Sequence, residues 1–105
     1  MYAVIFRAEI DRLDDDYLET ARSMRERAIE RYGCKDFVSL TEGDVEIGIS
    51  YWEEERQIAA WKRDAEHLLA QQRGRSRWYR SYRVEVSKIE RSYGSAAHDE
   101  PASGA

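Results

Sequence analysis

Two residues in the stretch 53–72, Trp61 and His67, have side chains that could do chemistry. The flat indole of Trp61 could form the wall of a pocket for a planar molecule. His67 is the one histidine within the predicted fold, and an imidazole can accept a proton near neutral pH. Both also have a structural interpretation, because Trp61 lies within an apolar helical stripe and His67 could be a boundary residue held by Asp64, one helical turn before it. The residues alone leave these alternatives open.

Three further aromatic residues lie near predicted strand ends and are candidate contacts for a bound molecule. Trp52 ends one strand on the parity opposite Ile49, and its structural interpretation is a cover over the next helix or a contact with a second subunit. Trp78 and Tyr82 lie where the last strand begins. Tyr82 shares parity with Val84, so we expect it to face inward, where its hydroxyl could serve a ligand or a buried partner.

Strand and helix patterns indicate the elements that must position these side chains. β-branched or alternating segments predict strands over residues 2–9, 35–42, 45–51 and 79–91. Acidic residues followed by apolar stripes predict helices from about Asp14 to Gly33 and from about Glu53 to Arg73. Ile89 breaks the alternation of the last strand, which predicts a bulge or a change of environment near residues 87–88. The order β-α-β-β-α-β predicts a ferredoxin-like α+β fold, a four-stranded antiparallel sheet with both helices on one face.

The sheet face that the helices leave bare predicts a second subunit. The strand over residues 2–9 is apolar on both faces at its start, whereas two helices can cover only one face. A chain of 105 residues also buries a modest share of its surface, so a second copy would add useful burial. Residues 1–93 are predicted to form one domain. Residues 94–105, rich in Gly, Ser, Ala and acid, are predicted to be a disordered tail.

Composition and charge exclude several classes of protein. No apolar run is long enough for a membrane span, the N-terminus lacks the features of a signal peptide, and the single cysteine, Cys34, favours a cytoplasmic protein. Without cysteine pairs a structural zinc site is not expected, and Cys34 is interpreted as an inert thiol.

The segment 73–83 combines arginines with aromatic residues, which is a pattern of single-strand nucleic-acid binders. The net charge of −4 argues against that function. The strand over residues 44–51 also carries acids and aliphatics where an RNA-binding sheet would carry its stacking residues. We therefore expect no nucleic-acid partner and expect these arginines to pair with the acidic helices of the same subunit and of a second subunit.

The stretch from Ile49 to Arg91 contains a series of residues at fixed spacing. In order, they are Ile49-Ser50-Tyr51-Trp52, Ile58-Ala59-Ala60-Trp61-Lys62, Glu66-His67, Ala70-Gln71, Gly74-Arg75, Trp78-Tyr79, Tyr82-Arg83-Val84 and Ile89-Glu90-Arg91. With this pattern the chain resembles the antibiotic biosynthesis monooxygenase-like family over about residues 1–94. The resemblance implies a dimeric α+β barrel in which the sheets of two subunits pack together.

The resemblance also implies a function, by analogy. Relatives oxidise polyphenols with molecular oxygen and without metal or flavin, so it implies a cofactor-independent monooxygenase for a planar phenolic or quinol-like substrate. Trp61 would wall the pocket, and His67 or Tyr82 would handle protons. Haem-cleaving relatives have a histidine ten residues after the helix tryptophan; Gln71 stands there, which disfavours haem and makes Gln71 a candidate substrate contact. The alternative is a non-catalytic dimer of the same fold that binds a small molecule or acts as an accessory protein.

Overall fold

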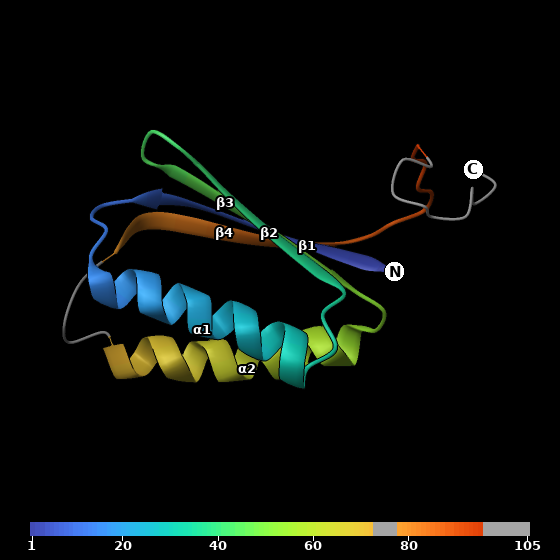
Figure 1. The fold of residues 1–105 in the computed structure, drawn as a ribbon, viewed down its shortest axis with the longest axis horizontal. Helices are drawn as coiled ribbons and strands as arrows, with labels where there is room; N and C mark the ends of the chain where they lie inside the picture. Colours follow the sequence, from blue (N-terminus) through green and yellow to red (C-terminus); the bar gives the residue numbers. More distant parts are fainter. Residues whose placement is uncertain (73–77, 96–105) are drawn as a thin grey trace.

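The structure is a computed structural model that describes residues 1–72 and 78–95, except the side chains of residues 68–72. It confirms the predicted fold, a single antiparallel sheet of strand order β2-β3-β1-β4 with two helices (Figure 1). No helix among the described residues is both long and apolar enough to cross a membrane. The elements are β1 (Tyr2–Ile10), α1 (Asp15–Arg31), β2 (Asp36–Glu42), β3 (Val45–Trp52), α2 (Glu55–Gln72) and β4 (Tyr79–Lys88).

The ends of α1 follow from local chemistry. Asp14 is its N-cap, and one carboxylate oxygen accepts the backbone N–H of Tyr17 at 2.8 Å. Gly33, at φ +85°, takes the left-handed conformation that lets the chain turn back after the helix. The backbone N–H of Cys34 then donates to the carbonyl of Ala28 at 2.9 Å, which fixes the path into β2.

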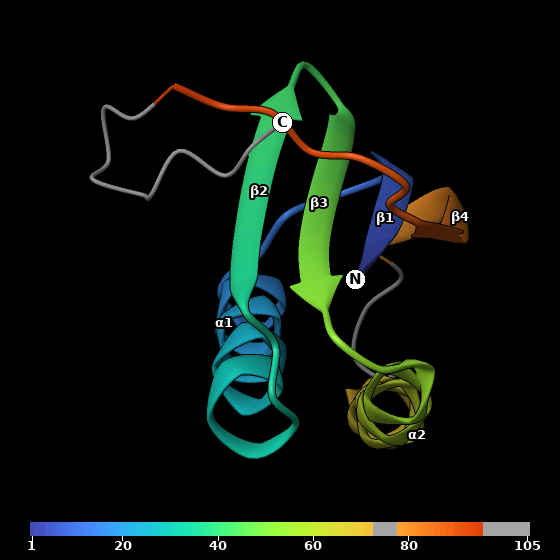
Figure 2. The same ribbon diagram turned by 90° about the vertical axis from the view of Figure 1, so that its right-hand side faces the viewer.

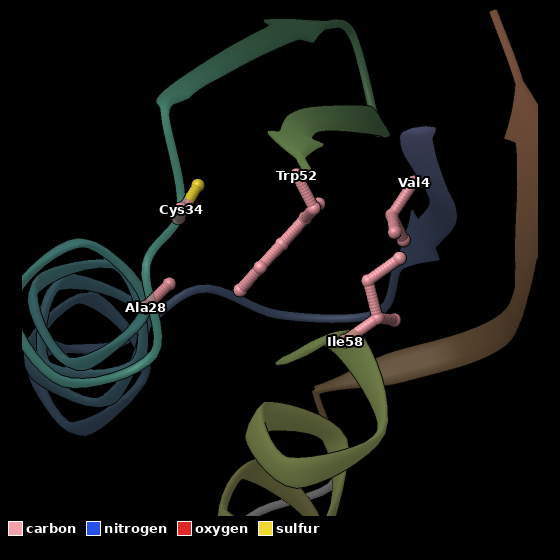
Figure 3. Packing of buried hydrophobic residues seen from close by; sticks show 5 residues of the cluster. All are labelled: Val4, Ala28, Cys34, Trp52 and Ile58. Carbon is pink, nitrogen blue, oxygen red and sulfur yellow. The ribbon is translucent and has the colours of Figure 1, made fainter. Parts of the chain in front are cut away.

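Both helices lie on the same side of the sheet, with α1 beneath β2 and α2 beneath the β1–β4 half (Figure 2). A buried cluster joins the layers, and its residues come from β1, both helices, the turn after α1 and the end of β3 (Figure 3). The side chain of Trp52 is fully buried at the centre of this cluster and extends toward Ala28 of α1. The helix-facing side of the sheet is therefore the side on which β1 presents Val4, Phe6 and Ala8.

The opposite side of the sheet, which we call the open face, carries aliphatic side chains without a covering helix. Ile5 of β1 pairs with Ile49 of β3, which pairs in turn with Val38 of β2, and Leu40 pairs with Ile47. Val38 and Leu40 remain 41% and 68% exposed. The expected bare apolar face is present, and it consists of Ile5, Val38, Leu40, Ile47 and Ile49.

Of the two alternatives near residues 87–88, the structure has no bulge there but a change of environment, because the strand ends. β4 continues regularly to Lys88, which pairs with Tyr2, and Ile89 has left the strand, with its backbone N–H donating to Met1 at 3.0 Å. The change of parity at Ile89 thus marks the end of the strand. The irregularity lies at the other end, where the register shifts between Glu9 and Ile10 and leaves Arg80 as the extra residue on β4.

The predicted tail, residues 94–105, lies mostly outside the described residues, since the description ends at Ser95. Tyr93, just before it, is 64% exposed. We expect a chain truncated after Tyr93 to melt within a few degrees of the full chain, because the composition of the tail offers no apolar surface to bury. Thermal unfolding followed by circular dichroism tests this, and a much larger fall in Tm would mean that the tail docks on the folded body or on a second copy.

Candidate functional site

Trp61 and Trp52 lie together where the helices meet the sheet. Their ring centres are 5.5 Å apart, and the ring of Phe37 lies edge-on to Trp61 at 6.0 Å. The indole N–H of Trp61 donates to the backbone carbonyl of Met24 in α1 at 2.9 Å, and that of Trp52 donates to the hydroxyl of Ser50 at 2.8 Å. Both polar atoms are thus already bonded within the protein. The geometry gives Trp61 the packing role that sequence analysis weighed against a pocket wall.

This contact leads to a stability prediction. Replacing Trp61 by Phe keeps an aromatic ring but removes the hydrogen bond to Met24 and part of the buried area, so we expect the free energy of unfolding to fall by about 1–3 kcal/mol. Urea denaturation of both proteins measures the difference. Unchanged stability together with weaker binding of a planar ligand would instead assign Trp61 to a ligand pocket.

His67 is exposed on α2, and the structure does not bring it to Trp61. On a helical wheel Asp64 and His67 turn progressively away from the inward-facing Trp61. The carboxylate of Asp64 accepts Nη1 of Arg27 at 2.9 Å and the hydroxyl of Tyr32 at 3.1 Å, both from the α1 side. Burial works against the charged form, but these two hydrogen bonds outweigh it and lower the pKa of Asp64 below its ordinary value. Asp64 therefore joins the two helices.

Trp78 and Tyr82 belong to a second aromatic group at the other end of the sheet. Trp78 is buried, its ring meets Tyr17 edge-on at 5.3 Å, and its indole nitrogen has no hydrogen-bond acceptor among the described residues. Tyr79 lies edge-on to Phe6 at 5.5 Å, and Tyr82 stacks on Phe6 at 6.0 Å. These five rings form the aromatic cluster, which spans α1, β1 and the start of β4.

The bulge at Arg80 explains why Tyr79 and Tyr82 meet. Side chains three residues apart on a regular strand point to opposite faces. The extra residue restores a common side: Tyr79 pairs with Ile10 and Tyr82 with Ala8, both on the helix-facing side of β1. A single irregularity thus lets β4 contribute two phenols to the cluster instead of one.

A carboxylate is bound to the cluster. Glu46 of β3 lies beside Ala8 on the helix-facing side, and the hydroxyl of Tyr17 donates to it. The ring of Tyr79 lies edge-on to that of Tyr17, with ring centres 5.8 Å apart. Burial, reinforced by Glu46, raises the pKa of Tyr17 far above its ordinary value, and burial raises that of Tyr79 to about 12. Both phenols are therefore neutral at physiological pH, and the hydroxyl of Tyr17 donates directly to Glu46.

The helix-facing side of β4 is only partly covered, although α2 lies beneath this half of the sheet (Figure 2). Tyr82 faces the helix side, as expected, but is 65% exposed, and Val84 and Val86 remain 47% and 49% exposed. The side chain of Gln71, further along α2, lies outside those described. Tyr82, Val84 and Val86 form an apolar surface next to the aromatic cluster, which we call the β4 surface.

Among the hollows lined by described residues are two that include neither Trp61 nor His67. One, open and shallow, lies between the end of α1 and the start of α2 and includes Tyr32 and Gln57. The other, which we call the α1 hollow, has a volume of about 260 Å3 and lies between α1 and the β2–β3 hairpin. Its polar lining consists of Tyr17, Arg22, Arg25, Ser39, Thr41 and Glu46.

The arginines of β4 pair differently from the expectation. Arg80 pairs with Asp11 at 3.8 Å and with Asp44, both in loops, and Arg83 pairs with Glu85 on its own strand at 3.8 Å. Among the described residues of this chain, these two arginines therefore pair with loops and with β4 itself, and the expected pairing with helices of a second subunit stays a prediction. Residues 73–77 lie outside the described residues. Cys34 is buried, and burial raises the pKa of its thiol, which agrees with an inert cysteine.

Sequence reasoning overlooked Glu46 and Tyr79 as functional candidates. Glu46 alternates with Val45 and Ile47, so it had the pattern of a solvent-facing residue on a half-buried strand. The structure places the aliphatic positions of β3 on the open face and Glu46, Ser50 and Trp52 under the helices. The signal for this orientation was Trp52 itself, a large aromatic residue on the same parity as Glu46.

Comparisons with known proteins identify relatives of this chain, although no family model matches it. It is 40% identical to YqjZ, an uncharacterized protein of Bacillus subtilis, over 91 residues that cover 86% of this chain and 80% of YqjZ. It is 28% identical to the jasmonate monooxygenase ABM of Pyricularia oryzae over 93 residues, 85% of this chain and 43% of that protein.

Solved structures agree at the level of the fold. PA3566 from Pseudomonas aeruginosa superposes with a TM-score of 0.63 at 14% identity, covering 84% of this chain and 93% of that one. A mutant of MhuD with two manganese protoporphyrin IX molecules bound per active site superposes with a TM-score of 0.62 at 15% identity, covering 90% and 100%. With this fold and these relatives, the chain belongs to the antibiotic biosynthesis monooxygenase-like family.

Proposed function

We propose that this protein is a small monooxygenase that oxidises a planar phenolic or quinol-like molecule with molecular oxygen, without a metal or flavin. The observation that carries the proposal is the aromatic cluster with its bound carboxylate, in a family that includes a relative named as a monooxygenase. In an anthrone-type substrate, a ring CH2 group becomes C=O, and the second oxygen atom leaves as water. The substrate thereby supplies all the electrons that reduce molecular oxygen.

The β4 surface is the proposed place of binding. Tyr82 and Phe6 stack on each other, and Tyr82, Val84 and Val86 together offer apolar area on the side of α2. A planar aromatic molecule would bury this area and stack on the Tyr82 ring, which favours association by the hydrophobic effect and by ring contacts. The fully buried Trp52 then supports the fold, and Trp61 positions α2 above the sheet.

Two groups of the described chain are candidates to accept the phenol proton. One is Glu46, which accepts from the hydroxyl of Tyr17, whose ring lies edge-on to that of Tyr79. The other is His67, the candidate from the sequence, which is exposed on α2. We propose Glu46, because the hydrogen bond from Tyr17 joins it to the aromatic cluster, and we keep His67 as the second candidate.

Oxygen uptake tests the proposal. The purified chain is supplied with a panel of anthrones, quinols and simpler phenols, and the oxygen concentration is followed with an electrode, against a control of substrate without protein. We expect uptake with at least one substrate, and weaker uptake in a Tyr82→Ser variant. If no substrate supports uptake above the control, the non-catalytic dimer that binds a small molecule becomes the better account.

The haem-binding relatives set up a further expectation. MhuD binds a porphyrin with manganese, whereas this chain has Gln71 at the place where the resemblance puts the haem-ligating histidine. A neutral amide is a poor iron ligand compared with an imidazole. We therefore expect no stoichiometric Soret shift when haem is titrated into the protein. A one-to-one shift that survives His67→Ala would contradict this and show that another group ligates the iron.

A further inference from the structure

We propose that the α1 hollow binds a small organic monocarboxylate, whose carboxylate group pairs with Arg22 and Arg25. The hollow has a volume of about 260 Å3 and is separate from the β4 surface, since it lies between α1 and the β2–β3 hairpin. The inference concerns binding alone. The hollow shares Tyr17 and Glu46 with the proposed oxidation, but its binding is tested without any turnover.

The two ends of the hollow differ in charge. Thr41 pairs with Glu46 across β2 and β3, and Tyr17 donates to Glu46, so these three residues mark one end. Ser39 lies two residues earlier on β2, about 7 Å away. Because α1 and β2 run in opposite directions (Figure 1), Ser39 lies level with the part of α1 that carries Arg22, five residues or about 7.5 Å beyond Tyr17.

The arginine end has the features of an anion site. The guanidinium carbon of Arg25 lies 6.0 Å from the ring centre of Phe37, which holds this side chain over β2. In the part of the chain that the structure describes, no carboxylate pairs with Arg22 or Arg25, whereas Arg27 of the same helix pairs with Asp64. Guanidinium groups bind carboxylates through paired charge-assisted hydrogen bonds. The Ser39 hydroxyl can add one more.

The other end limits what the ligand carries. Glu46 would repel a second negative charge, so the far end of the ligand must be neutral. A hydroxyl suits it, because it can donate to Glu46 and accept from Thr41. Leu18 and Ala21 line the hollow between the ends and favour an apolar body. At roughly 30 Å3 per water, the volume equals about nine waters, enough for a single ring. A hydroxyl-bearing aromatic or short-chain acid therefore fits.

Titration calorimetry on the full chain tests the proposal with three probes. The first is 4-hydroxybenzoate; phenol lacks its carboxylate, and terephthalate has a second carboxylate in place of the hydroxyl. We expect saturable binding of 4-hydroxybenzoate, and binding weaker by about 10-fold or more for the other two. Chemical-shift changes in amide NMR spectra locate the site, and they should appear in α1 and β2.

Single substitutions separate a built site from general charge attraction. Arg22→Ala and Arg25→Ala should each weaken 4-hydroxybenzoate binding by about 10-fold. Both side chains are exposed, so the fold is retained. Arg31→Ala is the matched control, an exposed arginine of the same helix outside the hollow, and should leave binding unchanged. No saturable binding up to about 10 mM, equal losses in all three variants, or shifts confined to other elements would each overturn the proposal.

Discussion

Replacing Glu46 by Gln is expected to lower the rate of substrate oxidation by about 100-fold, the usual scale for the loss of a general base. Gln keeps the size of the side chain and an oxygen that accepts from Tyr17, so the fold is expected to remain. It cannot take up a proton at that oxygen near neutral pH. Steady-state oxygen uptake with the best substrate of the panel measures the effect, and the Tm of the variant confirms that it is folded.

His67→Ala is the control for this prediction. The imidazole is exposed on α2, outside the aromatic cluster, so we expect its removal to leave the rate close to that of the wild type. Tyr79→Phe should also lower the rate, because the ring of Tyr79 contacts those of both Tyr82 and Tyr17, and its hydroxyl is the proposed link between them. A 100-fold loss in His67→Ala with a full rate in Glu46→Gln would instead make His67 the proton acceptor, as the sequence first suggested.

The second large effect concerns a second copy of the chain on the open face. The family resemblance implies a dimer, and the open face leaves Val38 and Leu40 exposed beside half-buried Ile5, Ile47 and Ile49. We expect a dimer that buries more than about 1,000 Å2 in total. Leu40→Asp would place a charge without a partner at that contact, and it should weaken dimerisation by about 100-fold or more.

Sedimentation velocity over a range of concentrations measures this weakening. Leu40 is 68% exposed in the single chain, so the variant monomer should still fold. Ile29→Asp on α1 is the matched control, because Ile29 is also exposed, at 46%, but lies on the helix layer. A wild-type chain that sediments as a monomer, or an Ile29→Asp variant that dissociates as readily as Leu40→Asp, would contradict a dimer formed through the open face.

The fold was predictable because its signals are local. Helix starts at acidic caps, the turn at Gly33 and the alternation in β3 each depend on a few neighbouring residues. The same alternation could not tell which side of the sheet the helices cover. One side of such a sheet is apolar because a partner covers it, and the other is apolar because helices cover it. Large apolar residues then occur at both odd and even positions of the strands. The alternation alone therefore gives Glu46 the pattern of a solvent-facing residue.

The candidate site depends on contacts between residues far apart in the chain. Trp61 and His67 lie six residues apart on one helix, yet they face different surroundings, because 600° of rotation leaves them about 120° apart. Tyr79 joins Tyr82 only through the bulge at Arg80, and strand patterns carry no signal for that residue. Tyr17 lies in the apolar stripe of the first helix, but its hydrogen bond to Glu46 spans 29 positions. Such pairings follow from the topology.

Isotopically labelled oxygen gas tests the monooxygenase proposal most directly. The protein is incubated with its best substrate under labelled dioxygen in ordinary water, and the mass of the product is measured by mass spectrometry. The account predicts that one labelled oxygen atom enters each product molecule, that the label is absent from a protein-free control, and that its rate of appearance falls in Tyr82→Ser. A product without label, or labelling that proceeds equally without the protein, would contradict a monooxygenase.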